Sequence, residues 1–303
     1  MNIRDLKYIV CVAECGHFGK AAEKCFVSQP TLSGQIKKLE ESLGVCLFER
    51  TNRSVVITPE GKEIVKHARI ILEQEAMIKA LAQGYQDPNV GSLKLGVIPT
   101  LSPYLLPLLF EPMSEQMPDM TLVLSEEFTE TLLQRLLEHK LDAVLIATEV
   151  IDDSLEVVSL FREPFFLAMP SNDSLVQKKT VTQNDLSKVE LLLLSEGHCL
   201  ADQTLDICQQ KKQTHGVFAD LRASSLETLL QMVSAGFGST LVPALALDSP
   251  WINNKKVSTR GLHLKNVFRD VSLVYRKSFP REPTLQSLSK IIKAVLPNSV
   301  SIL

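Results

Sequence analysis

Apolar residues recur at helical spacing in three short runs before Gly44. The first run begins at Leu6, residues 16–19 read as a turn, and residues 20–25 begin a second helix. Ser28 is a suitable N-cap for a third helix, which Gly44 ends. Three helices in so short a segment predict a helix-turn-helix.

The third predicted helix has one apolar stripe and one polar face. The stripe faces inward and consists of Leu32, Ile36, Leu39 and Leu43. Near the exposed start of the helix lies a polar set of Gln29, Pro30, Thr31, Ser33, Gly34 and Lys37. Such positions read bases when a helix of this kind enters the major groove of DNA.

Residues 46–48 and 55–57 read as two small strands around a polar tip. The tip carries Arg50 and Arg53, which suit contact with DNA phosphates. The segment therefore predicts a wing beside the helix-turn-helix. A plain three-helix core with a solvated hairpin fits the same periodicity and stays open on this pattern alone.

A long helix is predicted from Pro59 to about Tyr85, with Thr58 as its N-cap. Its apolar stripe repeats at the coiled-coil period of seven, at Ile64, Ile71, Ile78 and Tyr85. Two copies of the helix could pair along this stripe, or the stripe could pack on the protein's own core. Turn-forming residues at 83–91 then mark a boundary.

Beyond residue 91, runs of strand length alternate with helical segments. The first series has strands at residues 93–98, 121–124 and 143–146, with helices at 103–116 and 129–138. This alternation predicts a parallel sheet covered on both faces. A second series at 165–169, 191–194, 226–235 and 239–242 predicts a second α/β lobe. The predicted domains are residues 1–58, 59–90 and 91–303.

The composition is that of a soluble globular protein, because 45% of the 303 residues are hydrophobic and 22% are charged. The net charge of −3 is an average over the chain and decides nothing about nucleic-acid binding. No apolar run approaches the roughly 18 residues of a membrane span, and the N-terminus lacks a signal-peptide core. We therefore expect a cytoplasmic protein that does not associate with membranes.

Two of the six cysteines, Cys199 and Cys208, are nine positions apart. Cytoplasmic cysteines are expected to be free thiols, and any disulfide is expected to be regulatory. If residues 200–211 are helical, nine steps of about 1.5 Å place the two Cα atoms roughly 13 Å apart on opposite faces. A disulfide needs about 4.4 to 6.8 Å, so the pair can bond only if the helix is dismantled. Oxidation would then change the shape of the chain.

A cysteine that senses an oxidant needs a lowered pKa, access to solvent and a second sulfur. Cys199 meets the sequence criteria, because it is predicted at a helix start, follows His198 and has an open approach at Gly197. The alternative is a small buried hydrophobe, which is how we interpret the cysteines of the N-terminal segment, Cys11, Cys15, Cys25 and Cys46. Zinc is disfavoured, because the spacing matches no usual ligand set.

Several motifs of the N-terminal segment follow one another in a recognisable order. They are Ala21-Ala22, Val27-Ser28-Gln29-Pro30-Thr31-Leu32-Ser33, Leu47-Phe48-Glu49-Arg50 and Thr58-Pro59-Glu60-Gly61. In this order they resemble the LysR-type transcriptional regulators.

This resemblance implies an α/β protein with an N-terminal winged helix-turn-helix, a long linker helix and a two-lobed effector domain like that of periplasmic solute-binding proteins. It implies a transcription factor that binds promoter DNA, contacts RNA polymerase and forms a homo-oligomer, in particular a dimer of dimers. We expect no enzymatic turnover, no cofactor and no metal.

Motifs of the large domain extend the resemblance over nearly the whole chain. They are Ile98-Pro99-Thr100, Pro103-Tyr104-Leu105-Leu106-Pro107, Gly197-His198-Cys199-Leu200 and Ser225-Leu226-Glu227-Thr228-Leu229. These resemble the members of the family that sense hydrogen peroxide. The resemblance implies that Cys199 is the peroxidatic thiol and Cys208 its resolving partner, reset by cellular reductants of the glutaredoxin or thioredoxin type.

The same resemblance implies a peroxide pocket of Thr100, Thr129, His198, Asp202 and Arg269. Helix capping is the alternative role for the two threonines. Two departures bear on peroxide sensitivity, because Ala201 stands where relatives often carry a basic residue and Glu196 is not part of the expected acidic pair.

Three other functions fit part of the chain. A regulator of this family that responds to a metabolite would leave the thiols incidental, and it predicts that Cys199→Ser still responds to peroxide. A thiol peroxidase with an appended DNA module predicts sustained peroxide turnover with thioredoxin. A solute-binding protein is disfavoured by the missing export signal and by the first 60 residues.

Overall fold

The computed structural model describes residues 1–50, 55–84, 89–209, 222–252 and 255–303. Two compact units make up the chain, Met1–Asp87 and Pro88–Leu303. Each has its own hydrophobic core or cores. Among the described helices, none is long and apolar enough to cross a bilayer.

The N-terminal unit contains a three-helix core, a hairpin and a long helix. Its elements are α1 (Ile3–Cys15), α2 (Phe18–Lys24), α3 (Gln29–Leu43), β1 (Phe48–Arg50), β2 (Val55–Ile57) and α4 (Pro59–Gly84). As predicted, Ser28 caps α3, because its hydroxyl accepts the N–H of Thr31 at 3.3 Å. Helix α2 begins two residues earlier than predicted, because Nδ1 of His17 accepts the N–H of Gly19 at 2.9 Å.

The hairpin of β1 and β2 forms where the wing is predicted, although a three-helix core with a solvated hairpin would show the same pairing. Strand β1 begins at Phe48 rather than residue 46, because the amides at its start bond to α3 instead. The carboxylate of Glu40 accepts the N–H groups of Leu47 at 2.8 Å and Phe48 at 3.2 Å. Arg53 at the predicted wing tip lies outside the described residues.

Helix α4 divides into a buried part and an exposed part. Val65 and Ala68 are buried in the core of the N-terminal unit, so the early turns pack on the protein itself. Farther along, Ile71 is 39% exposed and Ile78 is 69% exposed. Packing on the chain's own core therefore accounts only for the first half of the predicted stripe, and Tyr85 lies outside the described residues.

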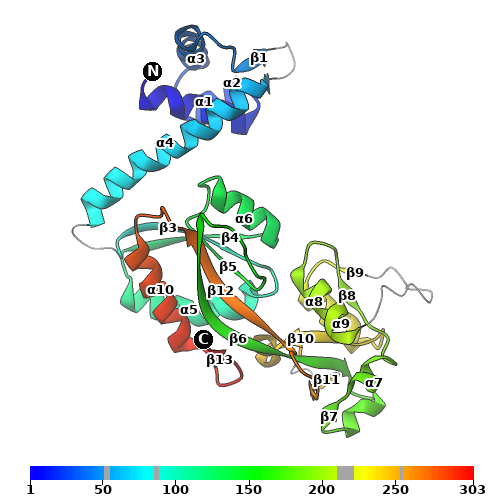
Figure 1. Ribbon diagram of the computed structural model, residues 1–303. Coiled ribbons are helices and arrows are strands. Elements are labelled where there is room, and N and C mark those ends of the chain that lie inside the picture. The colour runs from blue at the N-terminus through cyan, green and yellow to red at the C-terminus, as the bar shows by residue number, and fades with distance from the viewer. Residues whose placement is uncertain (51–54, 85–88, 210–221, 253–254) are drawn as a thin grey trace. The chain divides into compact units, whose positions relative to one another are not determined.

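The first lobe of the C-terminal unit is a mixed sheet flanked by helices (Figure 1). Its elements are β3 (Gly91–Val97), α5 (Ser102–Gln116), β4 (Met120–Glu126), α6 (Thr129–Leu137), β5 (Ala143–Ile146), β12 (Phe268–Arg276) and α10 (Glu282–Val295). Strands β3, β4 and β5 are parallel, as predicted, but β12 joins them antiparallel. The chain returns to this lobe through β12, so the expectation of a purely parallel sheet was wrong.

The second lobe is built on the far half of one long strand, β6 (Leu155–Pro170), which runs through both lobes (Figure 1). Strands β10 (Thr240–Pro243) and β11 (Val257–Leu262) pair antiparallel with β6, and β7 (Thr180–Val181) pairs with β11. The remaining elements are η1 (Ser174–Gln177), α7 (Gln183–Leu186), β8 (Leu193–Leu194), α8 (Cys199–Cys208), β9 (Arg222–Ala223), α9 (Leu226–Ser234), η2 (Ala244–Asp248) and β13 (Ser301–Ile302).

Two separate apolar cores confirm the predicted two-lobed α/β architecture. Residues of β3, β5, α5 and α10 form the first core, whereas residues of β10, α8 and α9 form the second. A hydrogen bond joins the lobes, in which the Tyr104 hydroxyl on α5 donates to Glu227 on α9 at 2.9 Å. Helix α8 packs in the second core, and both cores lie in the C-terminal unit.

A substitution of Gly61 tests the packing of the wing against α4. A Cβ added at Gly61 would lie 2.3 Å from the carbonyl oxygen of Leu47, so Gly61→Ala must shift backbone. We expect Gly61→Ala to destabilise the N-terminal unit by about 1–3 kcal/mol, measured by amide hydrogen exchange across α1 to α3. Gly34→Ala is the control, because its Cβ meets no atom within 4 Å and should stabilise the helix by about 0.5–1 kcal/mol. Unchanged exchange in Gly61→Ala would contradict this packing.

Candidate thiol site and DNA-binding surface

Cys199 and Cys208 are the first and last residues of α8. This confirms the predicted helix, and its rise of about 1.5 Å per residue separates the two Cα atoms by roughly 13 Å on opposite faces. Both cysteines are free thiols. Cys199 is partly buried, whereas Cys208 is only 1% exposed and burial raises its pKa to about 11. No disulfide can join them while α8 is intact.

A buried ion pair lies beside the start of α8. Arg269 on β12 and Glu163 on β6 face each other across the antiparallel pair, and Nε of Arg269 donates to the Glu163 carboxylate at 2.8 Å. Both side chains are fully buried. Arg269 also donates to the hydroxyl of Thr100 at 2.9 Å and to its carbonyl oxygen at 3.1 Å. The structure therefore brings together two of the predicted pocket residues, Arg269 and Thr100.

The pKa of Cys199 is raised above its ordinary value, mainly because the thiol is buried. The charge of Arg269, the hydroxyl of Thr129 and the backbone N–H of Leu200 act in the opposite direction. The expectation of a lowered pKa was therefore wrong for this arrangement. The helix start and the cation that the prediction relied on are present, but desolvation outweighs them.

His198 is a neutral, buried side chain rather than a cation beside the thiol. It is 3% exposed, and burial lowers its pKa. Its Nε2 lies 3.1 Å from the carbonyl oxygen of Ser224, so in the neutral ring Nε2 carries the proton and Nδ1 presents a lone pair. Nδ1 is buried and has no partner among the described residues.

Gly197 has a packing role that the sequence did not indicate. Its φ of +96° lies in the left-handed region, and an added Cβ would lie 2.9 Å from the ring of Phe128. The same ring packs edge-on against His198 with the centroids 4.7 Å apart. Instead of leaving an open approach, Gly197 lets Phe128 close against the segment before Cys199.

Two buried polar atoms near the thiol lack hydrogen-bond partners among the described residues. One is Oγ1 of Thr129, the first residue of α6, which acts on the Cys199 thiol but makes no hydrogen bond of standard geometry, and the other is Oε1 of Gln203. Neither Thr129 nor Thr100 caps a helix, so that alternative was wrong. Gln203 lies one turn after Cys199, and its Nε2 donates to the carbonyl of Ala147 at 2.8 Å. Gln203 was not among the predicted pocket residues, although its four-residue spacing from Cys199 could have indicated it.

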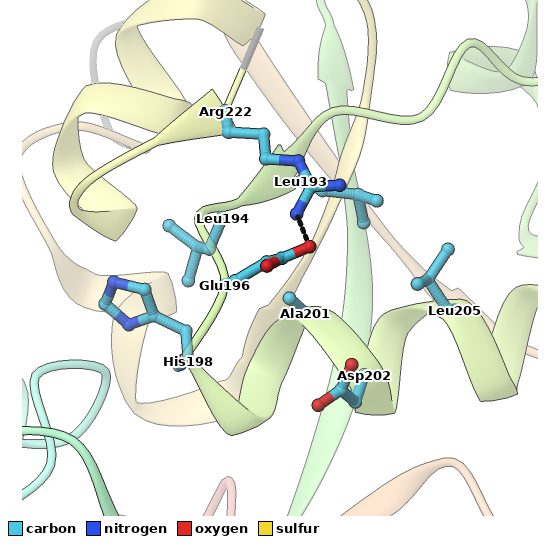
Figure 2. A pocket seen from close by; sticks show the side chains of 9 residues that line it. Leu193, Leu194, Glu196, His198, Ala201, Asp202, Leu205 and Arg222 are labelled. Atoms are coloured by element: carbon cyan, nitrogen blue, oxygen red, sulfur yellow. Dashed lines mark hydrogen bonds and ion pairs between the residues drawn. The ribbon is translucent and has the colours of Figure 1, made fainter. Parts of the chain in front are cut away.

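Asp202 takes no part in the hydrogen bonds that join Arg269 to Glu163 and Thr100. Its side chain is exposed and makes no hydrogen bond or ion pair with the described parts of the chain. It lines a cavity of about 270 Å³ together with Ala201, Leu205 and the ion pair of Glu196 with Arg222, which spans 3.2 Å (Figure 2). The structure therefore does not join Asp202 to Arg269 and Thr100.

The predicted DNA-reading residues lie on the exposed start of α3. Gln29, Pro30, Thr31 and Lys37 are exposed and Ser33 is partly buried, whereas the stripe of Leu32, Ile36 and Leu39 is buried. Arg50 ends β1 next to the undescribed tip. The α3 surface therefore has the geometry of a recognition helix.

Two family models match consecutive parts of the chain. The model of the bacterial regulatory helix-turn-helix protein, lysR family, matches residues 3–62, and that of the LysR substrate binding domain matches residues 86–297. The chain belongs to the LysR family. It is therefore a DNA-binding transcription regulator rather than an enzyme.

Relatives within the family share most of the chain. The DNA-binding transcriptional dual regulator OxyR of Escherichia coli is 40% identical over 97% of this chain and 95% of its own length. A full-length OxyR of Pseudomonas aeruginosa is similar with a TM-score of 0.81 at 38% identity, covering 97% of this chain and 95% of that chain. A peroxide-bound mutant of OxyR from Corynebacterium glutamicum has a TM-score of 0.67 at 32% identity, with coverages of 97% and 92%.

Removing the buried charge pair tests its influence on the thiol. We expect Arg269→Met with Glu163→Gln to raise the pKa of Cys199 further, because the thiolate loses the positive charge that favours it. The pH profile of Cys199 alkylation, followed by peptide mass spectrometry, should move to higher pH. Each unit of pKa lowers the thiolate fraction at neutral pH about tenfold.

The neighbouring cross-strand pair supplies a matched control. Arg162 and Asp270 join the same two strands at 2.7 Å, but both are exposed by about two-fifths. Arg162→Met with Asp270→Asn should leave the alkylation profile of Cys199 unchanged. Equal profiles for the two double variants would contradict a specific effect of Arg269.

Proposed function

We propose that this chain is a peroxide-responsive transcription regulator that binds promoter DNA and senses hydrogen peroxide through Cys199. The observation that carries the proposal is the position of the two thiols at opposite ends of α8, with Cys199 beside Arg269 and Thr129. The names of the relatives support it, because several are called hydrogen peroxide-inducible genes activators.

The sensing step is a nucleophilic attack by sulfur on peroxide. Cys199 loses its proton, its sulfur forms a bond to one oxygen of hydrogen peroxide, and the O–O bond breaks. The other oxygen leaves as hydroxide and takes up the released proton, which gives water and Cys199 sulfenic acid. Since burial favours the protonated thiol, the positive charge of Arg269 would act on the developing anions.

The unpartnered polar atoms of Thr129, His198 and Gln203, residues around Cys199, suit a small ligand that both donates and accepts hydrogen bonds. Hydrogen peroxide has two O–H groups and two acceptor oxygens. The hydroxyl of Thr129 can donate to it, whereas Oε1 of Gln203 and Nδ1 of His198 can only accept.

The resolving step converts the chemical signal into a change of shape. The sulfur of Cys208 attacks the sulfur of Cys199, the S–O bond breaks, and water leaves as the disulfide forms. Because the helix holds the two sulfurs apart, α8 must unfold for this bond to form. Thiol–disulfide exchange with cellular reductants of the glutaredoxin or thioredoxin type then resets the switch.

The output of the switch is a change in the way that the oligomer engages DNA. The start of α3 would read the major groove, with Gln29, Thr31 and Lys37 nearest the bases and Arg50 and Arg53 on phosphates. Pairing of two α4 helices would cover the exposed side chains of Ile71 and Ile78. A dimer of dimers with altered half-site spacing would then change its contact with RNA polymerase in the cytoplasm.

A footprint before and after one equivalent of peroxide tests the proposed function. In the unaltered protein we expect the DNA footprint to change, together with a peptide containing the Cys199–Cys208 disulfide in the mass spectrum. Cys199→Ser should abolish both, because the attacking sulfur is gone. Cys46→Ser is the control, since this exposed thiol of the N-terminal unit should change neither result.

Two outcomes would contradict the proposal. A peroxide-dependent footprint that persists in Cys199→Ser would favour a regulator that responds to another signal. Sustained peroxide turnover in the presence of a thioredoxin system would indicate a peroxidase instead of a sensor.

A further inference from the structure

The proposed function leaves two features of the chain unused, the cysteines of the N-terminal unit and one large cavity. Of those cysteines only Cys11 is buried, whereas Cys15 and Cys25 are partly exposed and Cys46 is exposed. The prediction of small buried hydrophobes was therefore wrong for three of the four. Within the described ranges they join no group of three metal-binding side chains, so they form no site of that kind.

The cavity has a volume of about 540 Å³ and is lined by residues of both lobes of the C-terminal unit. Helix α5 and the end of α10 contribute from the first lobe and α9 from the second, while η2 and the residues just after it complete the lining. Small-molecule sites have volumes of about 300–1,000 Å³. The lining contains none of the residues predicted for the peroxide pocket, so this cavity is a separate candidate site.

The lining combines buried and exposed side chains, so the cavity runs from the interior to the surface. Leu245 is 7% exposed and Ser249 is 8% exposed, whereas Trp251 is 42% exposed. The hydroxyl of Ser249 is buried and has no hydrogen-bond partner among the described residues. Such a group is uncommon in folded proteins, and here it belongs to a residue in the wall of a cavity.

The charge of the lining is negative. Glu227 on α9 and Asp248 at the end of η2 supply two carboxylates, and the described lining contains no lysine, arginine or histidine. Glu227 accepts the hydroxyl of Tyr104 at 2.9 Å and forms no ion pair with the described residues. Burial and the neighbouring Glu227 carboxylate raise the pKa of Tyr104, so its hydroxyl stays protonated and leaves the negative charge of Glu227 in place.

These groups favour an organic cation over other small ligands. The two carboxylates would repel an anion, and a neutral apolar molecule would leave the charge of Glu227 uncompensated. An organic ammonium ion would pair with the carboxylates and place its apolar body against the proline, leucine and valine side chains that make up the rest of the lining. The aromatic rings of Tyr104 and Trp251 also attract cations.

We propose that this cavity binds an organic ammonium ion with an aryl or alkyl body, held by Glu227 and Asp248 beside Trp251. The inference goes beyond peroxide sensing and does not depend on it. The ligand would contact elements of both lobes and would bind only the folded protein. It would therefore raise the unfolding temperature of the C-terminal unit.

The cavity adjoins the buried ion pair of the thiol site through one backbone group. The N–H of Leu245 donates to Glu163 at 2.7 Å, and Glu163 accepts from Arg269 at 2.8 Å. Substitution of Leu245 would disturb both sites. Glu227 makes its side-chain hydrogen bond with Tyr104 alone, so it is the better residue for a test.

Fluorescence of Trp251 reports on the cavity directly, because it is the only tryptophan of the chain. The test titrates the full-length protein with 2-phenylethylamine, which is a cation at neutral pH. Its isosteres 2-phenylethanol, which is neutral, and phenylacetate, which is an anion, are titrated in parallel. We expect the amine to saturate the Trp251 signal below about 10 mM and to raise the unfolding temperature. The alcohol should bind at least about tenfold more weakly, and phenylacetate should not bind.

A matched pair of variants tests the role of the charge. Glu227→Gln keeps an oxygen that can accept from Tyr104 but removes the charge, so affinity for the amine should fall about tenfold. Adding Asp248→Asn should lower that affinity further. Glu111→Gln is the control, because it removes the same charge from an exposed position of α5 outside the cavity and should leave binding unchanged.

Four outcomes would overturn the proposal. They are equal binding of the amine and the alcohol, no response of Trp251 to the amine, equal affinity of Glu227→Gln and Glu111→Gln for the amine, and a Trp251 signal that changes with protein concentration when no probe is present. The last outcome would show that a second copy of the chain covers the cavity. The comparison of the three probes uses the unaltered protein, so it does not depend on the folding of any variant.

Discussion

One helix keeps two sulfur atoms apart, and the regulatory design of the molecule depends on that separation. Cys199 and Cys208 are the terminal residues of α8, so every backbone hydrogen bond of this helix opposes their union. A disulfide that could form without rearrangement would oxidise the thiols but would not change the structure of the chain. Here the Cys199–Cys208 disulfide and the intact helix α8 exclude each other, so this segment has two alternative states.

The buried pair of Arg269 and Glu163 fixes the other half of the thiol site. Removing two charges from water costs desolvation free energy, which is offset only when their hydrogen-bonding groups are satisfied. Glu163 accepts from Arg269 and from the N–H of Leu245, at 2.8 and 2.7 Å, while Arg269 also holds Thr100. This network joins the middle of β6 to the loop after β3 and keeps a fixed positive charge near a desolvated thiol.

Much of the fold could be predicted from local sequence, because periodicity and caps act over a few residues. The stripe of α3, its Ser28 cap and the helix between the two thiols followed from residues that are adjacent along the chain. The antiparallel return of β12 did not, because pairing with β5 and β6 joins segments more than one hundred residues apart.

The chemistry of the site was less predictable than its position. Resemblance to a family proposed Arg269 and Thr100 together, but nothing local indicated Glu163 as their partner. The pKa of Cys199 was predicted in the wrong direction, because burial depends on the packing of both lobes.

Amide hydrogen exchange of α8, measured on the reduced protein and on protein oxidised with one equivalent of peroxide, tests the central claim most directly. The account predicts that the amides from Leu200 to Cys208 are protected in the reduced state and exchange rapidly once the Cys199–Cys208 disulfide has formed. If the disulfide is present and those amides keep their protection, the helix does not oppose the bond and the account is contradicted.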